Sequence, residues 1–340
     1  METRSHLQGR TLRFVKPQSH WRWEIAIYLY LAGMGAGAYI IGLTIHWVAD
    51  ALNPSNLILL FGVSFDISKA ILLWGPILVA IGAPFLILDL GIKKRFLYAC
   101  LNPGTSWVAR GFLILSAFIV LGLLVFGGSI FSSDIFPAAT PFHLTLEVIS
   151  VTLAIATALY TGVLLKSVKY VPIWNTFFLP LLFLVSALST GSMAIILSLL
   201  GYGLLTPFAA PSYALIDALI PIEQVLIAVE AFVLAFYLFS RYRAQDQGET
   251  SVRLLISGDL RLLFWGGIAT TGFFFPIVLE YLYKHFPGNP VLLIMTGLFL
   301  LSGGFFLRLG VLSAGLKEQL PMHKWAEIKL NIQPLRKKAS

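Results

Sequence analysis

Acidic, phenolic and basic side chains recur near the ends of long apolar segments in this sequence. Six of them fall near one common end of those segments: Glu24, Tyr28, Asp89, Arg110, Tyr160 and Arg308. Phenols donate hydrogen bonds and carboxylates accept them or carry protons, so such a set can hold a polar headgroup. The alternative is that the tyrosines anchor helix ends at the membrane interface and that the charged residues only cap or pair.

A second set of ionisable residues lies toward the opposite end or in the middle of the segments: Asp66, Lys69, His143, Glu147, Glu223, Glu230 and Glu280. A charge at the centre of a bilayer costs about 2.5–3.5 kcal/mol even on insertion scales. The deeper acids should therefore face a protein interior, pair with another group or carry a proton. We predict a proton path through Glu147, Glu223, Glu230 and Asp66. The alternative for Asp66, His143 and Glu280 is a hydrated position at the headgroups.

The segments that must position these residues are membrane helices. Hydrophobic residues make up 58% of the 340 residues and charged residues only 12%, whereas soluble domains carry about 25% charged residues. Apolar runs of about 20 residues span roughly 30 Å of hydrocarbon as helices, and a helix satisfies its own backbone hydrogen bonds in lipid. We expect an all-α integral membrane protein with about eight transmembrane helices in a bundle. A division into two four-helix halves is compatible with that number.

The predicted spans are 23–49, 68–90, 107–129, 143–166, 176–200, 218–240, 260–283 and 290–314. The stretch 53–66 is compatible with a re-entrant or interfacial segment, or with the early part of the second helix. A basic N-terminal segment, 1–22, precedes the bundle, 23–315, and a basic tail, 316–340, follows it. The polar, basic start leads directly into a full-length span, which does not fit a cleavable signal.

Basic residues mark one side of the predicted bundle. They occupy the N-terminal segment, alternate loops and the tail, including Lys93, Lys94, Arg95, Lys166, Lys169, Arg241, Arg243, Arg253 and Lys317. The opposite side holds only Lys69 and Lys284. By the positive-inside rule this bias puts both termini in the cytoplasm. The net charge of +8 therefore reflects topology rather than a nucleic-acid-binding face.

The sequence offers few side chains that could ligate a metal cofactor. Cys100 is the only cysteine, which excludes a Cys-ligated iron–sulfur cluster or zinc site within the chain. The six histidines lie in tails or near helix ends, so we do not expect a haem held between two of them. Gly33 and Gly37, one turn apart in the first span, favour close helix packing over a dinucleotide-binding loop.

A series of short motifs resembles the NrfD family of membrane subunits, which includes the quinone-binding subunit of polysulfide reductase. The motifs are 23–37, 88–91, Arg95-Phe96, Ser106-Trp107, Arg110-Gly111, 160–162, Pro172, Trp174-Asn175, 179–191, Phe264-Trp265, Pro276, 303–305, Leu307-Arg308 and Ala314-Gly315. The run 179–191 is the most distinctive. Each motif alone is weak, and their common order and spacing carry the resemblance.

The resemblance implies quinone-binding residues. In the polysulfide reductase subunit an Asn and a His on the first helix and a Tyr on the fourth hold the headgroup, and these match Ile25, Tyr28 and Tyr160. An acidic residue at the end of the second helix matches Asp89. Tyr28 still donates a hydrogen bond but does not exchange protons near neutral pH as histidine does. Ile25 forms no side-chain hydrogen bond, so Glu24 is the candidate substitute, and Arg110 completes the predicted site.

The resemblance also implies partners and a location. A family member exchanges electrons between menaquinone or ubiquinone and an iron–sulfur subunit, and through it serves a molybdopterin-type or cytochrome catalytic subunit at the cytoplasmic membrane of a prokaryote. The basic rim suits an acidic partner, although topology alone also explains it. Many relatives look arranged for partners outside the cytoplasm, which conflicts with the charge bias. Two alternatives stay open: a proton- or ion-coupled transporter with Pro-broken helices, and a membrane anchor without quinone chemistry.

Overall fold

The computed structural model describes residues 23–52, 57–60, 63–89, 104, 106–130, 140–205, 210–244, 246–286 and 288–317. Its long helices are α2 (Trp23–Leu52), α4 (Trp74–Asp89), α6 (Trp107–Ile130), α7 (Pro141–Lys166), α8 (Phe178–Leu205), α9 (Ala210–Tyr242) and α12 (Pro290–Ser313). Shorter elements are α3 (Ile67–Ala70), the 3-10 turn η1 (Ile71–Leu73), α10 (Gln247–Ile256), the π-helix η3 (Leu263–Phe274) and α11 (Phe275–His285). The predicted N-terminal segment 1–22, the basic residues Lys93, Lys94 and Arg95, and the tail beyond residue 317 lie outside the described residues.

The helices are those of a multi-pass membrane protein. Within the described ranges, seven helices are long and apolar enough to cross a membrane, and Ile71–Leu86 is a shorter apolar helix. Large apolar side chains such as Val225, Phe232 and Leu298 are 59–63% exposed on the outside of the bundle, where lipid would cover them. Each predicted span overlaps an observed helical segment, so the prediction of about eight helices is confirmed.

The stretch between the first two spans is not the early part of the second helix, so that alternative is wrong, and the re-entrant or interfacial alternative stays a prediction. Strands β1 (Leu57–Leu60) and β2 (Val63–Asp66) form a short antiparallel hairpin in which Leu57 pairs with Asp66 and Leu60 pairs with Val63. Consecutive aliphatic residues followed by a tight reversal suit paired strands. The second span therefore starts only at Ile67, after the hairpin.

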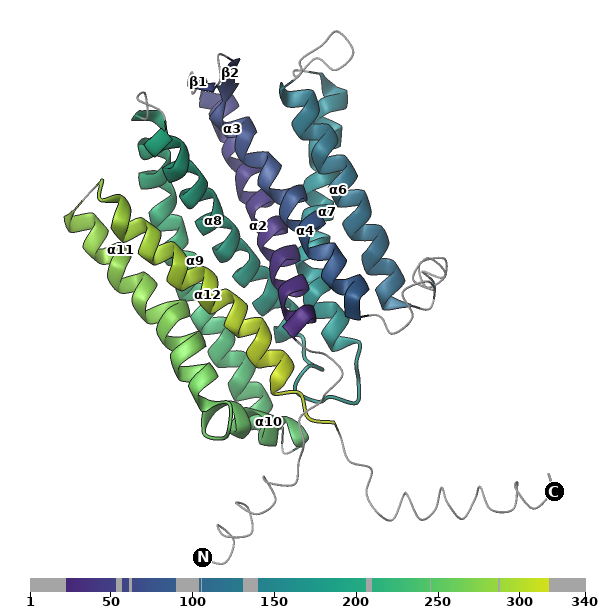
Figure 1. Ribbon diagram of the computed structural model, residues 1–340. Helices are drawn as coiled ribbons and strands as arrows, with labels where there is room; N and C mark the ends of the chain where they lie inside the picture. Colours follow the sequence, from purple (N-terminus) through teal and green to yellow (C-terminus); the bar gives the residue numbers. More distant parts are fainter. Residues whose placement is uncertain are drawn as a thin grey trace, which may run out of the picture.

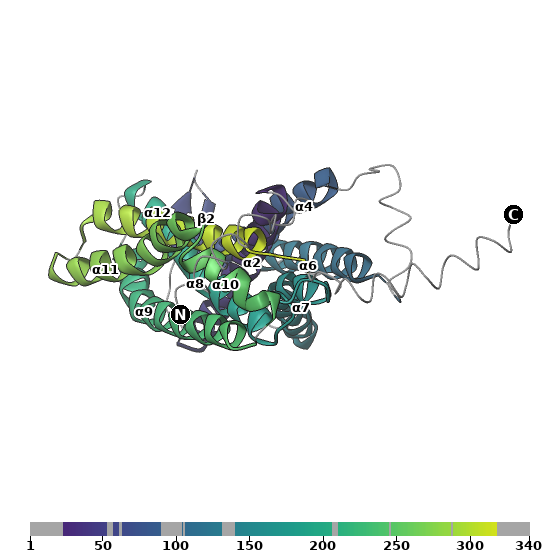
Figure 2. The ribbon, with the colours of Figure 1, turned by 90° about the horizontal axis from the view of Figure 1, so that it is seen from below.

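The bundle is arranged as two four-helix halves that meet along α2 and α8. The first half consists of α2, α4, α6 and α7, and the second of α8, α9, α12 and the continuous η3–α11 segment (Figures 1 and 2). Helix α2 packs against α4, α7 and α8, so it contributes to both halves. The start of α2 and the end of α12 lie at the same end of the bundle (Figure 1), as an even number of spans requires.

Glycine permits the closest contact between the halves. A Cβ on Gly37 of α2 would overlap the backbone of Ala187 on α8, and a Cβ on Gly191 would overlap the backbone of Gly37. Any larger side chain at Gly37 would push the two helices apart. The predicted packing role of this glycine is therefore confirmed, and it follows the small-residue rule of membrane helices.

The connection between α7 and α8 is held to the second half by side chains that bond to its backbone or to helix ends. The Nε1 atom of Trp174 donates to the Val311 carbonyl at 2.8 Å. The Tyr237 hydroxyl donates to the Ile173 carbonyl at 2.9 Å, and Nη1 of Arg241 donates to the Pro172 carbonyl at 2.9 Å. These bonds satisfy irregular backbone where the chain leaves the helices, and they account for the tryptophan of the 172–175 motif.

Candidate functional site

Tyr28 and Tyr160 come together in the first half of the bundle. Tyr28 on α2 is completely buried, Tyr160 on α7 is 3% exposed, and the two side chains are close enough to interact electrostatically. Tyr160 donates a hydrogen bond to the Trp107 carbonyl of α6 at 3.1 Å. Within the described part of the chain, the Tyr28 hydroxyl has no hydrogen-bond partner. Both tyrosines are too deeply buried to serve as interface anchors, so that alternative is wrong for them.

Glu24 and Arg110 are the other members of the predicted site whose side chains the structure describes. Glu24 precedes Tyr28 by one turn of α2, and its Oε2 atom is buried without a hydrogen-bond partner among the described residues. The guanidinium of Arg110 stacks 4.6 Å from the ring centroid of Trp107, and its Nη2 donates to the Gly104 carbonyl at 2.6 Å. Arg110 is thus held along its own helix at the rim of the site.

A glycine makes room for the phenol of Tyr160. A Cβ added to Gly111 of α6 would overlap the ring and hydroxyl of Tyr160. The dipeptide Arg110-Gly111 therefore has a steric role: the arginine stacks at the rim, and the glycine lets the tyrosine reach the Trp107 carbonyl. The motif was recognised in the sequence, but its contact with Tyr160 was not predicted.

Two predicted site residues are described only by their backbone. Asp89 is the last residue of α4, which packs against α2, and Asp66 is the last residue of β2. The positions of their carboxyl groups lie outside what the structure describes. Their roles therefore stay predictions from the sequence.

Glu147 lies in a separate cluster toward the opposite end of the first half. Its Oε1 atom is 3.2 Å from Nε2 of His143 and 3.5 Å from Nε2 of His46. Its Oε2 atom accepts a hydrogen bond from Nε1 of Trp47 at 2.7 Å. The hydroxyl of Ser129 lies 3.3 Å from Nε2 of His143. We call His46, Trp47, Ser129, His143 and Glu147 the histidine cluster.

The ionisable side chains of the histidine cluster are buried, contrary to the hydrated alternative for His143. His46, His143 and Glu147 are 3–4% exposed, so a hydrated headgroup position is wrong for His143. The sequence placed both histidines near helix ends and did not predict that they face the same carboxylate. One signal was available, because His143 and Glu147 are four residues apart and so share a helix face.

Glu223 and Glu230 lie in the second half, together with groups from three other helices. Both acids are on α9, Glu280 is on α11 and Arg308 is on α12; all four are at most 6% exposed. Ser189 of α8 donates to Oε1 of Glu223 at 2.9 Å. Glu223 interacts electrostatically with both other acids, and Glu230 with Arg308. We call Ser186, Ser189, Ser192, Glu223, Glu230, Glu280 and Arg308 the acid cluster.

Arg308 links the acid cluster to α8 and α2. Its Nη1 donates to the hydroxyl of Ser186 and, at 3.0 Å, to the Gly304 carbonyl. Its guanidinium lies 5.8 Å from the ring centroid of Tyr30 on α2. The sequence assigned Arg308 to the same membrane face as Tyr28, with capping or pairing favoured. The structure buries Arg308 completely within the bundle, where it interacts electrostatically with Glu230.

Several atoms of the acid cluster are unsatisfied. Across the described part of the chain, the buried side-chain atoms of this cluster without a hydrogen-bond partner are Glu223 Oε2, Glu280 Oε1 and Oε2, Ser192 Oγ, and Arg308 Nε and Nη2. Glu280 is completely buried, so the predicted alternative of a hydrated headgroup position is wrong for it. Sequence reasoning also missed Ser186, Ser189 and Ser192, although hydroxyls spaced three residues apart in an apolar helix are a usable signal.

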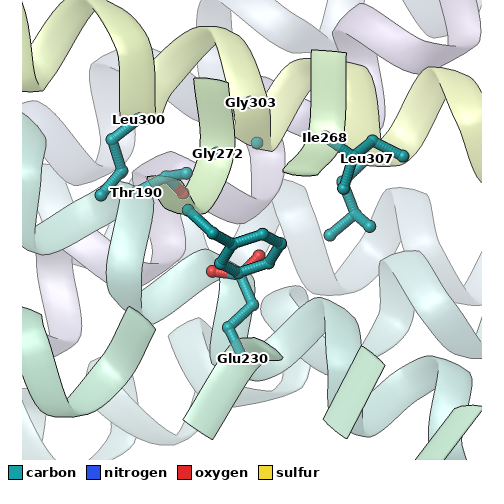
Figure 3. A pocket seen from close by; sticks show the side chains of 9 residues that line it. Thr190, Glu230, Ile268, Gly272, Leu300, Gly303 and Leu307 are labelled. Atoms are coloured by element: carbon teal, nitrogen blue, oxygen red, sulfur yellow. The ribbon is translucent and has the colours of Figure 1, made fainter. Parts of the chain in front are cut away.

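A small pocket opens beside Glu230. Its cavity volume is about 10 Å³, and it lies between α8, α9, η3 and α12. Figure 3 shows Glu230 extending from α9 into this pocket, across from Thr190, Gly272 and Gly303. Small-molecule sites usually enclose about 300–1,000 Å³, so a cavity of about 10 Å³ has room for one water at most and not for a cofactor.

Metal ligation has no support in the described ranges, where no group of three or more His, Cys, Asp or Glu residues is placed to hold a metal ion. The polar groups of the bundle instead form three sets: the two tyrosines with Glu24, the histidine cluster and the acid cluster. The first offers hydrogen bonds to a ligand, and the others offer proton-carrying groups.

Comparisons with known proteins agree with the family resemblance. The family model described as "Polysulphide reductase, NrfD" matches residues 11–318. The sequence is 32% identical to the C chain of polysulfide reductase from Wolinella succinogenes over 314 residues, covering 87% of this protein and 94% of the relative. It is 26% identical to protein NrfD of Escherichia coli over 317 residues, with the same two coverages.

Proposed function

The chain belongs to the NrfD family, and from this premise we propose that it is the quinone-binding membrane subunit of a respiratory oxidoreductase complex. In this role it binds menaquinone or ubiquinone between α2, α6 and α7 and exchanges electrons with an iron–sulfur partner subunit. The partner in turn serves a catalytic subunit of the molybdopterin or cytochrome type. The complex resides in the cytoplasmic membrane of a prokaryote.

The unpartnered Tyr28 hydroxyl is the observation that supports this proposal best. A buried polar group without a hydrogen bond costs about 1–3 kcal/mol, which a ligand acceptor beside Tyr28 would remove. A quinone carbonyl is such an acceptor, and Tyr160 offers a second hydroxyl nearby. When bound, a quinone takes up or releases two electrons and two protons. Glu24, with one buried unpaired oxygen, is placed to hold a proton at Oε2.

The residues at this site meet some of the requirements for binding a quinone headgroup. Among the described residues, Tyr28 supplies one free donor in an apolar surrounding that includes Ile25 and Leu29. Tyr160 would supply a second donor only by giving up its hydrogen bond to the Trp107 carbonyl. Ile25 offers no side-chain hydrogen bond at the position matched to the asparagine of the polysulfide reductase subunit, so the headgroup depends on Tyr28 and Glu24 on this helix. Asp89 on α4 and Arg110 on α6 complete the proposed set.

The acid cluster supports a proposed proton route. Along α9, Glu223 and Glu230 are two turns apart, and Glu280 and Arg308 extend this series in opposite directions. At the end of this series nearest the quinone site, the guanidinium of Arg308 approaches the ring of Tyr30, which is two residues from Tyr28. The series thus runs from α11 to the helix that carries the quinone site. Glu147 and Asp66 remain predicted members of the route.

The partner would dock at the basic end of the bundle. Lys166 lies over the ring of Phe177 at 5.7 Å, and Lys317 lies over the ring of Tyr170 at 6.0 Å. Both rings are more than half exposed. Tyr160 is near this end of α7, so an acidic electron-transfer protein bound here would be close to the quinone site. On the charge bias this end is cytoplasmic.

The substitution Tyr28→Phe in the intact complex tests the proposal. It removes one donor and keeps the ring, so we expect quinone affinity to fall about tenfold, equivalent to about 1.4 kcal/mol. Quinone content of the purified complex and quinone-dependent turnover are the measurements. Tyr39→Phe is the matched control, because Tyr39 is equally buried on α2 but its hydroxyl already bonds to Ser150 at 2.8 Å. Unchanged quinone affinity in Tyr28→Phe would refute the proposed site.

A further inference from the structure

Four oxygen atoms with free hydrogen-bonding capacity converge around Glu223. They are Glu223 Oε2, both carboxylate oxygens of Glu280 and the hydroxyl of Ser192, and none has a hydrogen-bond partner in the described part of the chain. All three residues are completely buried. Ser192 and Glu280 both lie beside the Glu223 carboxylate. Glu223 thus has a second buried acid and a buried hydroxyl beside it.

Lys284, one turn further along α11, is the positive charge that acts on Glu280. The Nζ atom of Lys284 donates to Oε1 of Gln224 at 3.0 Å. Arg308 bonds to α8 and α12 and interacts electrostatically with Glu230, the third acid facing Glu223. Two carboxylates that face each other in an apolar interior repel strongly when both are ionised. Among the described residues no positive charge acts on Glu223 itself, so its repulsion with Glu280 is only partly compensated, through Lys284.

We infer that Glu223, Glu280 and Ser192 form a binding site for one exchangeable monovalent cation, either a proton or Na⁺. Carboxylate and hydroxyl oxygens are the ligands that hard cations prefer. Ser189 fixes Glu223 through Oε1 and leaves Oε2 directed at the site. One bound positive charge removes the repulsion and satisfies oxygens that are otherwise costly to bury.

The site lies near one end of the bundle. Glu280 lies five residues before the end of α11, where Lys284 and His285 are exposed. At the same end of α9 and α11, the hydroxyl of the buried Tyr283 donates to Oδ1 of Asp217 at 3.4 Å. Inward, Glu223 leads to Glu230 and its pocket. A cation entering from this end reaches the pair before it reaches the pocket.

This inference rests on the proton route of the proposed function but not on quinone binding at Tyr28. The test uses the purified full-length chain, with NaCl exchanged against choline chloride at constant ionic strength. A ligand that binds only the folded protein raises its unfolding temperature. Infrared spectroscopy as a function of pH detects a protonated carboxyl group in parallel.

Three results are informative. If Na⁺ raises the unfolding temperature of the wild type but not of Glu223→Gln or Glu280→Gln, the cation is Na⁺. If Na⁺ has no effect and a protonated carboxyl signal disappears in either variant, the cation is a proton. If both variants match the wild type in Na⁺ response and carboxyl signal, the inference is overturned.

Two further variants keep the test informative if Glu223→Gln or Glu280→Gln fails to fold. Ser192→Ala keeps both acids and is expected to weaken the Na⁺ response or to move the pH at which the carboxyl titrates. Glu249→Gln is the control, because Glu249 pairs with Arg253 on the exposed face of α10. Quinone content measured on the same samples separates failure of this inference from failure of the quinone site: loss of the cation site alone leaves quinone binding unchanged.

Discussion

The two halves of the bundle bury acids in opposite ways. In the first half, both carboxylate oxygens of Glu147 are engaged, one by two imidazoles and the other by an indole N–H. In the second half, Glu280 has two free oxygens and Glu223 one, as judged against the described residues. Burial is nearly the same in both halves, at 0–4% exposure for these three acids.

The difference teaches that burial alone does not separate a structural acid from a functional one. A satisfied carboxylate stabilises the helices that supply its partners, here α2 and α7. An unsatisfied carboxylate costs free energy until something binds to it. Substitutions in the two clusters should therefore have opposite signatures: large losses of stability in the first half, and changes in binding with little loss of stability in the second.

Replacing Glu147 by alanine should have the largest effect on stability. The change leaves two buried imidazoles and the Trp47 indole without their common acceptor, and breaking a buried pair in this way costs about 3–5 kcal/mol. The free energy of unfolding in mixed detergent micelles is the measurement. Glu147→Gln keeps an acceptor for Trp47 and should lose less. A Glu147→Ala protein as stable as the wild type would remove the distinction between the clusters.

Trp47→Phe should have an intermediate effect. It removes the 2.7 Å hydrogen bond to Oε2 of Glu147 and leaves that oxygen buried without a donor, which costs about 1–3 kcal/mol. The same unfolding measurement applies, and Trp74→Phe is a suitable control because Trp74 is 39% exposed. Equal stability of the two variants would show that the indole only fills space.

Glu280→Gln should have the smallest effect on stability. The amide keeps the shape of the side chain and removes its repulsion with Glu223, so we expect a change of less than about 1 kcal/mol, or a gain. Unfolding in the same micelles, compared with Glu147→Gln, gives the clearest contrast. A loss comparable to that of Glu147→Ala would mean that Glu280 has partners as strong as those in the histidine cluster.

The number and order of the spans could be predicted because a membrane helix depends on a local property, a run of about 20 apolar residues. The hairpin at 57–66 could not, since an aliphatic run of that length suits a strand or a helix equally well. Its pairing of Leu57 with Asp66 depends on a chain reversal that no strong turn motif announces.

In the candidate site, too, local sequence motifs were predictable, whereas contacts between distant segments were not. Family motifs pointed to Tyr28 and Tyr160, which the structure brings together. Side-chain partners across helices were not predictable: the approach of His46 to Glu147 depends on how α2 and α7 are rotated against each other. Arg308 was assigned to a membrane face by its place in the sequence, and only three-dimensional packing shows that it bonds to Ser186.

The π-helix η3 has a consequence for the orientation of everything that follows it. Its turns are wider than those of an α-helix and continue without a break into α11. Each residue of an α-helix advances the chain by about 100° around the axis. Deleting one residue from η3 would therefore turn α11 by roughly that angle and rotate Glu280 from the interior toward lipid. The extra width of η3 thus sets the rotational phase of α11, and with it the direction in which this acid faces.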